Sequence, residues 1–437
     1  MTRIANIRIT PIALKDPPLL NASGVHEPFT LRSIIEIDSD DGATGLAETY
    51  GDDDTLVRLQ AVAPHLHGMG THDLFALSQA VSSHGRGRHT GVALDLAPGT
   101  HPERALDKVF AAFETGLADL NARRAGLPLC DWLGGRTRDR VPYSAYLFYK
   151  FGQHHGQPYG GSAGSGAGTS AGGGSGDPWG EALDAAAVVR QAQTMVAQYG
   201  FGSIKLKAGV FEPDQEADCL LALHEAFPQH PLRIDPNGNW SLATALRVAQ
   251  QVGSALEYYE DPVPTLADMA ALQQQTGLML ATNMVVCDRR EFAANVALGS
   301  PVRTILSDHH FWPGFRATRE LAALCDTFGL RLSMHSNSHA GISLMAMTHL
   351  AASVPGLAYA CDTHYPWQSE DVIQGGRVPF VDGCVAVGTA PGLGVALDRD
   401  ALGALHEQYL RCGIRSRNDT LEMQKHQPGF VKRKPRF

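Results

Sequence analysis

Chemically functional residues recur at nearly constant intervals through the middle of this 437-residue chain. The series starts with two lysines and continues through carboxylate, amide and imidazole side chains: Lys205 and Lys207, Asp235, Glu260, Asn283, Asp308 and His335. From Lys207 onward the spacings are 28, 25, 23, 25 and 27 residues. Such an interval fits one strand, one helix and two short loops, so each residue would occupy the same place in a repeated βα unit. The spacing predicts a barrel whose strand ends meet at one active site.

Short apolar runs lead into the members of this series and predict parallel strands at 203–207, 232–236, 255–260, 279–283, 304–308 and 330–335. Helical patterns separate them. The helix at 185–199 should stop at Gly200, and Ser241 should cap the start of another helix. An open doubly wound sheet is the alternative, but a functional group after nearly every strand favours a closed barrel.

An α+β front domain precedes the barrel. We expect strands at 4–13 and 30–49 with a hairpin turn at 40–45, and an amphipathic helix at about 103–124. A Gly/Ser-rich insertion at 156–178 is too poor in large apolar groups to pack. It is interpreted as a flexible insertion, with a mobile lid over the barrel mouth as the alternative.

The composition narrows the class of protein. With 36 basic and 45 acidic side chains the formal charge is −9, which argues against nucleic acid as a partner. Seven scattered cysteines without a C-x-x-C pair indicate a reducing compartment, and we expect them to be small core residues. No apolar stretch is long enough to span a membrane. The sequence therefore predicts a soluble cytoplasmic protein that does not bind membranes.

The Lys205-Leu206-Lys207 tripeptide places two ammonium groups on the same face of a strand. Inside a barrel they would lower each other's proton affinity, which would allow one to act as a neutral base. Solvated lysines at a strand end are the alternative.

Three oxygen-bearing side chains follow successive strands. Asp235, Glu260 and Asn283 together form the kind of hard donor set that suits Mg²⁺. Taken singly, Asp235-Pro236-Asn237-Gly238 could be only a turn and Glu260-Asp261-Pro262 only a helix start.

Asp308 and His335 follow neighbouring strands on the far side of the predicted mouth. A carboxylate that fixes the imidazole tautomer would make this pair a second acid/base group, whereas an ordinary hydrogen-bonded histidine is the alternative. His335 and His339 also form an H-x-x-x-H pattern, but Ser336-Asn337-Ser338 favours a loop over a zinc-binding helix.

The ordered set of motifs resembles the enolase superfamily, and most closely its glucarate dehydratase branch. The matching segments span almost the whole chain: Asn21-Ala22-Ser23-Gly24-Val25-His26, Lys205-Leu206-Lys207, Asp235-Pro236-Asn237-Gly238, Glu260-Asp261-Pro262, Asn283-Met284, Asp308, His335-Ser336-Asn337-Ser338-His339, Asp362-Thr363-His364 and Pro391-Gly392-Leu393-Gly394. Asn283 as a third metal ligand and the Asn-x-Ser-Gly-x-His segment point to the acid-sugar branch.

The resemblance implies a modified TIM barrel, (β/α)7β, at 136–398. An α+β capping domain at 1–135 would carry a closing loop near 18–30, and the segment 399–437 would return to this cap. Paired barrels are common in such folds, so a homo-oligomer is expected by analogy.

The implied reaction is a Mg²⁺-dependent dehydration of an acid sugar, most closely D-glucarate or L-idarate, to 5-dehydro-4-deoxy-D-glucarate. Lys207, assisted by Lys205, would serve one face of the carbon next to the carboxylate, and the Asp308/His335 pair the other. Two bases would also permit epimerisation. The alternatives are dehydration or racemisation of another aldarate or aldonate, and a non-catalytic relative that binds acid sugars.

The resemblance also implies contacts to a sugar diacid by Asn21, His26, Tyr146, Asn237, Ser336, Asn337, His364 and Arg417. Arg417 would clamp a carboxylate, with a solvated tail arginine as the alternative, and the nearby 432–434 run is interpreted as a basic surface. Three features depart from the branch: Ala105 replaces a substrate-contacting threonine, residues 84–104 do not align, and Ala340-Gly341 would enlarge the pocket.

Overall fold

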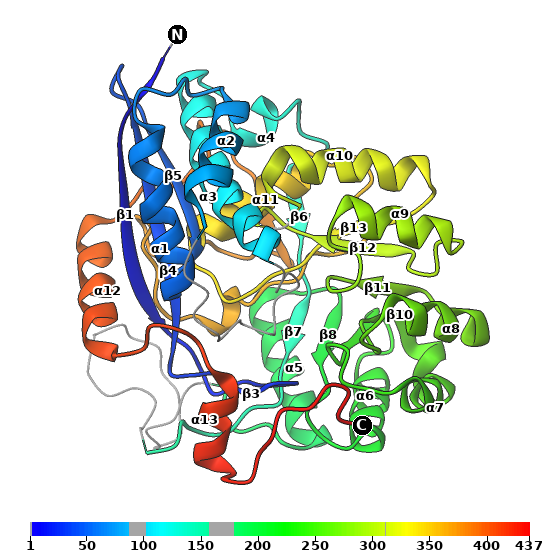
Figure 1. Cartoon of the computed structure of the whole chain (residues 1–437). Coiled ribbons are helices and arrows are strands. Elements are labelled where there is room, and N and C mark those ends of the chain that lie inside the picture. Colours follow the sequence, from blue (N-terminus) through cyan, green and yellow to red (C-terminus); the bar gives the residue numbers. More distant parts are fainter. Residues whose placement is uncertain (1, 87–101, 157–178, 311) are drawn as a thin grey trace.

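The computed structural model describes residues 2–86, 102–156, 179–310 and 312–437. An antiparallel sheet with its helices forms a cap, which lies beside a barrel of parallel strands surrounded by helices (Figure 1). The predicted lid or flexible run within 157–178, and residues 87–101 of the poorly aligning segment, fall outside the described residues. The predicted fold class is confirmed.

The sheet of the cap has three antiparallel strands in the order β1 (Ile4–Lys15), β4 (Phe29–Ser39) and β5 (Thr44–Tyr50). The hairpin between β4 and β5 turns where the Asp-Asp-Gly signal predicts it, and Gly42 adopts a positive φ of 88° there. Helix α3 (Pro102–Arg124) covers this sheet, with Phe113 and Leu117 in one core cluster with Ile35 of β4. The predicted amphipathic helix is therefore confirmed.

Shorter elements complete the cap: α1 (Asp53–Val62), η1 (Ala63–Leu66), α2 (Leu74–His84) and α4 (Leu129–Trp132). In the loop predicted to close over the barrel, β2 (Leu20–Asn21) pairs antiparallel with β3 (Gly24–Val25). The backbone N–H of Leu20 donates to the carbonyl of Tyr149, 2.8 Å away. This loop is thereby attached to the start of the barrel.

Seven parallel strands of the barrel run in sequence order: β7 (Ala145–Leu147), β8 (Ile204–Lys207), β9 (Leu232–Asp235), β10 (Leu256–Glu260), β11 (Leu280–Thr282), β12 (Thr304–Ser307) and β13 (Arg331–Met334). Residues 357–362 fill the eighth place. The N–H of Asp362 donates to Met334 O at 2.9 Å on one side, and the N–H of Ser144 donates to Cys361 O at 2.9 Å on the other. The barrel is thus closed, as the sequence predicts.

Helices connect these strands: α5 (Ala185–Tyr199), α6 (Pro213–Ala226), α7 (Leu242–Val252), α8 (Leu266–Thr276), α9 (Arg289–Ala297), α10 (Gly314–Thr327) and α11 (Gly341–Ala352). The predicted end signals hold. Gly200 ends α5 in the left-handed conformation at φ 73°, and the Ser241 hydroxyl accepts the N–H of Thr244 at the start of α7.

A buried polar network joins the cap to the barrel. Arg32 of β4 donates to Glu48 of β5 at 2.8 Å, and both side chains are almost fully buried. Glu48 also accepts the N–H groups of Ala340 and Ser343, each at 2.8 Å, at the start of α11. The Arg32 guanidinium lies 3.2 Å from the ring of His310 in the barrel. The carboxylate of Glu48, a residue of the capping domain, therefore binds the free N–H groups at the N-terminus of the barrel helix α11.

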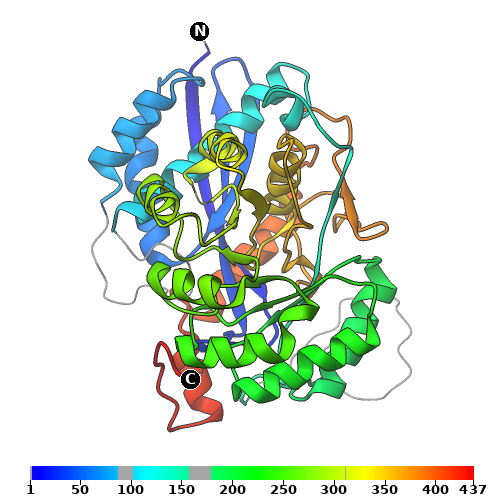
Figure 2. The same ribbon diagram turned by 90° about the vertical axis from the view of Figure 1, so that its right-hand side faces the viewer.

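The remaining elements are β6 (Arg140–Pro142), which pairs with β14 (Cys384–Ala386), the short helices η2 (Gly253–Ala255) and η3 (Tyr365–Trp367), and the terminal helices α12 (Arg399–Cys412) and α13 (Asp419–His426). Helix α12 packs on β1 and α13 on β3, so both return to the cap. The red end of the chain then reaches the green barrel helices (Figures 1 and 2).

Two further findings bear on the composition. No helix among the described residues is long and apolar enough to cross a membrane. All seven cysteines are free thiols. The prediction that all are core residues is wrong for three that are only half-buried: Cys287, Cys384 and Cys412.

Candidate active site

Two ammonium groups from β8 approach one carboxylate at the end of β9. The Nζ atom of Lys207 lies 2.6 Å from Oδ2 of Asp235, and that of Lys205 lies 3.6 Å from the same oxygen. Lys207 and Asp235 are register partners in the parallel pair of strands. Because alternate residues of a strand share a face, both lysines point toward the same interior site. The solvated-lysine alternative is wrong, since both side chains are buried.

Lys205 is held as a fixed cation. Its Nζ atom lies 2.6 Å from Glu260 and 2.6 Å from Asp362. Burial alone would lower the pKa of Lys205, but the carboxylates of Asp362 and Glu260 outweigh it and hold the pKa well above its ordinary value. The prediction that the two lysines depress each other's proton affinity is therefore wrong for Lys205, because carboxylates dominate its surroundings.

Three buried oxygen donors converge from the ends of β9, β10 and β11; Asp235, Glu260 and Asn283 are called the donor set below. Neither Oε1 of Glu260 nor Oδ1 of Asn283 accepts a hydrogen bond within the described residues. Such buried acceptors are unfavourable unless a cation or donor meets them. Two carboxylates and one amide are the hard ligands that Mg²⁺ prefers, so the residues present fit that ion.

The excess of negative charge around the donor set also favours a bound Mg²⁺ ion. Asp261 and Asp362 add two more buried carboxylates beside Lys205 and Lys207. Burial and the nearby Asp235 raise the pKa of Glu260, as expected where negative charge is in excess. Within the described part of the chain, no group of three or more His, Cys, Asp and Glu side chains could hold an ion, so the Asn283 amide would be needed.

Asp261 fixes the position of Asn283. Its Oδ2 atom accepts the backbone N–H of Asn283 at 2.8 Å, and its Oδ1 atom accepts the hydroxyl of Thr282. Asp261 itself has a positive φ of 36°, which is uncommon for a residue other than glycine. The strained backbone of Asp261, directly after Glu260, allows the Asp261 carboxylate to hold Asn283 in position.

The two residues predicted to form an acid/base pair, Asp308 and His335, lie at the ends of β12 and β13. The Nδ1 atom of His335 is 3.5 Å from Oδ2 of Asp308, whose Oδ1 accepts the N–H of His310 at 2.7 Å. Burial raises the pKa of Asp308, but the contact with His335 and the nearby His309 lower it below its ordinary value overall. Residues 335–340 form a loop, so the predicted loop is confirmed and the H-x-x-x-H pattern lies on no helix.

Tyr146 and Asn237 both touch Asp235. The Tyr146 hydroxyl donates to Oδ2 of Asp235 at 3.3 Å, and its ring faces the Lys205 ammonium group at 4.6 Å. Asn237 donates its backbone N–H to Oδ1 of Asp235 at 3.0 Å from a left-handed conformation, φ 54°. These contacts place two of the predicted substrate-binding residues at the donor set.

The loops after β13 and after residues 357–362 carry three more of these residues. The Ser336 hydroxyl lies 2.9 Å from Nδ1 of His364, whose ring packs edge-on against Tyr146. Asn337 donates to the hydroxyl of Tyr50 in the cap at 2.6 Å. Ser336 and His364 therefore join the His335 side of the site to Tyr146, while Asn337 contacts the cap.

The residues predicted to bind the far carboxylate are engaged with carboxylates of the chain itself. Asn21 donates to Asp419 at 2.7 Å, and Arg417 donates to Asp419 through both Nε and Nη2 at 2.6 Å. His26 lies 3.0 Å from Asp16. The solvated-tail alternative for Arg417 is wrong, because its guanidinium group is mostly buried and bound at two points.

Asp362, which anchors Lys205, stands among the matching segments, but the sequence predicted no role for it in the site. Its signal was present, because Asp362 stands 27 residues after His335 and so continues the regular series by one more strand.

The prediction that Ala340-Gly341 enlarges the pocket is wrong at Gly341. A Cβ atom there would lie 2.7 Å from Ile373 and 2.8 Å from Asp371, which fill the space. Ala105 is half-buried on α3.

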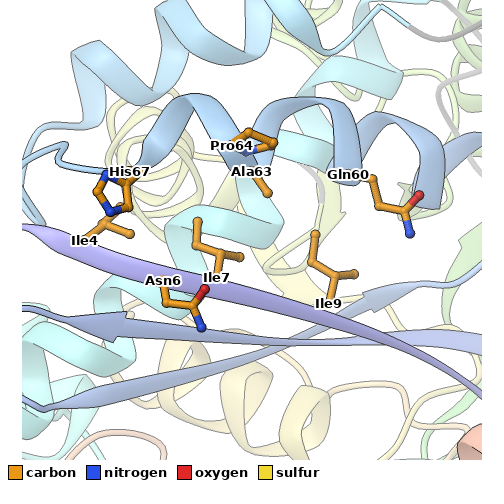
Figure 3. Close-up of a pocket in the computed structure, with 8 residues that line it drawn as sticks. All are labelled: Ile4, Asn6, Ile7, Ile9, Gln60, Ala63, Pro64 and His67. Atoms are coloured by element: carbon orange, nitrogen blue, oxygen red, sulfur yellow. The ribbon is translucent and has the colours of Figure 1, made fainter.

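Figure 3 shows a separate cavity of about 300 Å³ between β1 and the α1–η1 segment of the cap. It is lined by Ile4, Asn6, Ile7, Ile9, Gln60, Ala63, Pro64 and His67. None of these residues belongs to the site at the strand ends, so this cavity plays no part in the chemistry above.

Comparison with known proteins agrees with this geometry. The family profile described as "Enolase C-terminal domain-like" matches residues 187–401. A protein of Streptomyces coelicolor described as a probable glucarate dehydratase is 46% identical over 440 residues, which covers 99% of this chain and 98% of that protein.

Two solved structures show the same fold over the full chain. An enolase from Pseudomonas fluorescens Pf0-1 with bound magnesium, potassium and tartrate is 53% identical, with a TM-score of 0.93 and coverage of 100% of this chain and 99% of that one. An enolase from Mycobacterium smegmatis in complex with tartrate is 47% identical, with a TM-score of 0.90 and the same coverage.

Proposed function

Because this chain belongs to the enolase superfamily, we propose that it is a magnesium-dependent acid-sugar dehydratase, a carbon–oxygen hydro-lyase. D-glucarate and L-idarate are the proposed substrates. The observation that carries the proposal is the placement of Lys207 and of the Asp308/His335 pair on either side of the donor set. The relative described as a probable glucarate dehydratase and the tartrate-bound enolases support a hydroxylated diacid as substrate.

The donor set would hold the metal ion. Bound there, Mg²⁺ would supply positive charge to the substrate carboxylate next to the reacting carbon. Lys205 contributes a second, permanent positive charge at the same place, because its buried ammonium group is fixed between Asp362 and Glu260. A pre-oriented charge of this kind stabilises the negative charge that develops when the α-proton leaves.

The two proposed acid/base groups would act on opposite faces of the reacting carbon. Lys207 or His335 removes the proton from the carbon next to the carboxylate, and the electron pair passes into the carboxylate. The β-hydroxyl then leaves with one proton as water. The resulting enol takes up a proton on carbon and gives up its hydroxyl proton, which yields the keto acid. Asp308 orients the imidazole of His335 and stabilises its charged form. A base on each side would accept either epimer at the reacting carbon.

Residues around this centre would orient the sugar hydroxyls and the far carboxylate. Tyr146, Asn237, Ser336, Asn337 and His364 would contact the substrate from the barrel, and Asn21 and His26 from the closing loop. Arg417 could serve as a carboxylate clamp only where it exchanges Asp419 for the substrate.

A panel of acid sugars, each incubated with the purified protein and Mg²⁺, tests the proposal. Keto acid should form from D-glucarate and L-idarate, and chelation of the metal should stop it. A panel in which no diacid yields keto acid would refute the proposal. Keto acid from a different aldarate or aldonate alone would favour the second candidate, in which the same groups act on another acid.

Two wider expectations accompany this function. The free thiols of all seven cysteines support a reducing, cytoplasmic location. A homo-oligomer remains the proposed assembly, and light scattering at two protein concentrations tests it.

A further inference from the structure

The closing loop is joined at its base by Asp16. The backbone N–H of Asp16 donates to the carbonyl of Pro28 at 3.0 Å, so the two sides of the loop meet there. Within the loop, the N–H of His26 donates to the carbonyl of Leu19 at 2.8 Å. These bonds bring two side chains together, and Nδ1 of His26 lies 3.0 Å from Oδ2 of Asp16. Both side chains are almost fully buried.

This pair has the same arrangement as His335 and Asp308, in which Nδ1 of the imidazole also faces Oδ2 of a buried carboxylate. A carboxylate can only accept hydrogen bonds, so Nδ1 of His26 carries a proton. The second ring nitrogen, Nε2, forms no hydrogen bond with any residue that the structure describes. An imidazole that is held at one nitrogen in this way offers the other nitrogen to a ligand.

Two barrel loops hold the Asp16 carboxylate in turn. The hydroxyl of Ser338 donates to Oδ2 at 3.3 Å, and Nε2 of Gln368 donates to Oδ1 at 3.2 Å. Ser338 stands three residues after His335, and Gln368 stands four residues after His364. The carboxylate therefore connects the closing loop to the segments that carry a proposed base and a proposed substrate contact.

Aromatic contacts place His26 beside the site. Its ring packs edge-on against Phe148, with the ring centroids 5.9 Å apart. Phe148 also contacts the ring of His364 at 5.2 Å and that of Tyr146 at 4.7 Å. The hydroxyl of Tyr146 donates to Asp235 of the donor set. One aromatic ring therefore separates His26 from two residues of the site.

We propose that Asp16 is a positioning residue, which holds His26 in the orientation and tautomer that bind the substrate. The inference rests on the proposed function, in which His26 contacts the substrate from the closing loop. Because two barrel loops bind Asp16, His26 reaches this state only when the closing loop is docked on the barrel. The Asp16 carboxylate does not touch the substrate, so it acts on substrate binding through His26.

NMR of the histidine ring nitrogens, on protein with isotope-labelled histidine, tests the hold on His26 without turnover. The His26 signals are identified by their loss in His26→Gln. They should report a proton on Nδ1 in the starting protein. Asp16→Asn should shift them towards a proton on Nε2, because an amide oxygen is a weaker acceptor than a carboxylate. Asp218→Asn makes the same change in charge at an exposed position and should leave them unchanged.

Steady-state kinetics test the effect on the substrate. In Asp16→Asn the KM for the diacid should rise by about tenfold with little change in kcat, because binding loses an oriented contact. If Asp16 acts through His26, adding Asp16→Asn to His26→Gln should raise KM no further. Ser338→Ala removes one bond to Asp16, so it should also raise KM, and it replaces Asp16→Asn if that variant does not fold.

A proton on Nε2 of His26 in the starting protein would overturn the inference, as would His26 signals or a KM that stay unchanged in Asp16→Asn. Effects on KM that add in the double variant would also overturn it, because Asp16 would then only stabilise the fold. A His26 tautomer that depends on Asp16, in a protein that dehydrates no diacid, would support Asp16 as a positioning residue and refute the proposed function.

Discussion

The guanidinium group of Arg417 meets the carboxylate of Asp419 through two parallel hydrogen bonds, each 2.6 Å long. Such a fork is the geometry with which arginine binds the carboxylate of a ligand. In the proposed function, Asp419 would thus occupy the place of the far carboxylate of the substrate. Since Asn21 also donates to Asp419, the closing loop and the C-terminal segment are tied together at this point.

Replacing Asp419 by Asn should therefore release the fork. We expect the KM for a diacid to fall several-fold, because the substrate would no longer compete with an internal carboxylate. The temperature of thermal unfolding should fall as well, since a mostly buried guanidinium group loses its ionic partner. Steady-state kinetics and scanning calorimetry measure the two effects. A KM that rises to the same extent as in Arg417→Ala would show that Asp419 only holds Arg417 in place.

Replacing Lys207 by Ala should stop exchange of the α-proton for one epimer only. Lys207 and His335 stand on opposite sides of the donor set, so each should serve its own face of the carbon. In D₂O, NMR should show loss of exchange by about 10²-fold or more for one epimer, while the other still exchanges. His335→Asn is the reciprocal variant. If either variant loses both exchanges equally, the division of faces is incorrect.

Replacing Asn283 by Leu should raise the Mg²⁺ concentration needed for half-maximal activity by about tenfold or more. The change removes one of three oxygens in the donor set and keeps the side chain of similar size. A metal titration of activity, supported by calorimetric binding of Mg²⁺ alone, measures the shift. Asn6→Leu makes the same change at an exposed position of the cap and should leave both curves unchanged. If the two variants give superimposable curves, Asn283 is not a ligand of the metal ion.

Replacing Glu216 by Gln should change the pH dependence of stability. Glu216 is buried and accepts the N–H groups of Gly209, Val210 and Phe211, each within 3.0 Å, directly after Lys207. An amide cannot accept all three bonds, so the variant should lose about 1–3 kcal/mol. Burial raises the pKa of Glu216 from 4.5 to about 7 despite these hydrogen bonds.

Because the folded state binds this proton more tightly than the unfolded state, the stability from protonation is fully present below pH 4.5. It is lost as the pH rises through about 7. The advantage of the starting protein over Glu216→Gln should therefore shrink from about pH 5 to about pH 8. Urea unfolding at several pH values measures it, with the exposed Glu212→Gln as control. An advantage that grows with pH would contradict the assigned direction of the pKa shift.

Regular spacing made the barrel predictable. Each strand candidate ends within about two residues of the observed strand, because the run of apolar residues and the polar residue after it mark the same boundary. End signals such as Gly200 and Ser241 were equally reliable, since they depend only on local backbone geometry. Asp362, for which the sequence predicted no role, also continues the series, 27 residues after His335.

Contacts between distant segments could not be predicted in this way. Neither the contact of Asn21 with Asp419 nor the pairing of Arg436 with Asn239 leaves a periodic signal, because both depend on where the C-terminal segment returns. The same applies to Gly341, whose space is taken up by Ile373 and Asp371 from a later loop. The composition of a segment shows which groups are available, while long-range packing decides which of them face the site.

The bond network around Glu48 restricts how the site can open. This single carboxylate joins β5 of the cap to the first turn of α11, and its partner Arg32 contacts His310 beside Asp308. Swinging the whole cap away as a rigid body would break this buried network and leave its charged groups without their partners. Substrate entry and product release would therefore depend on local movements of short segments, with the cap sheet and the barrel moving as one piece.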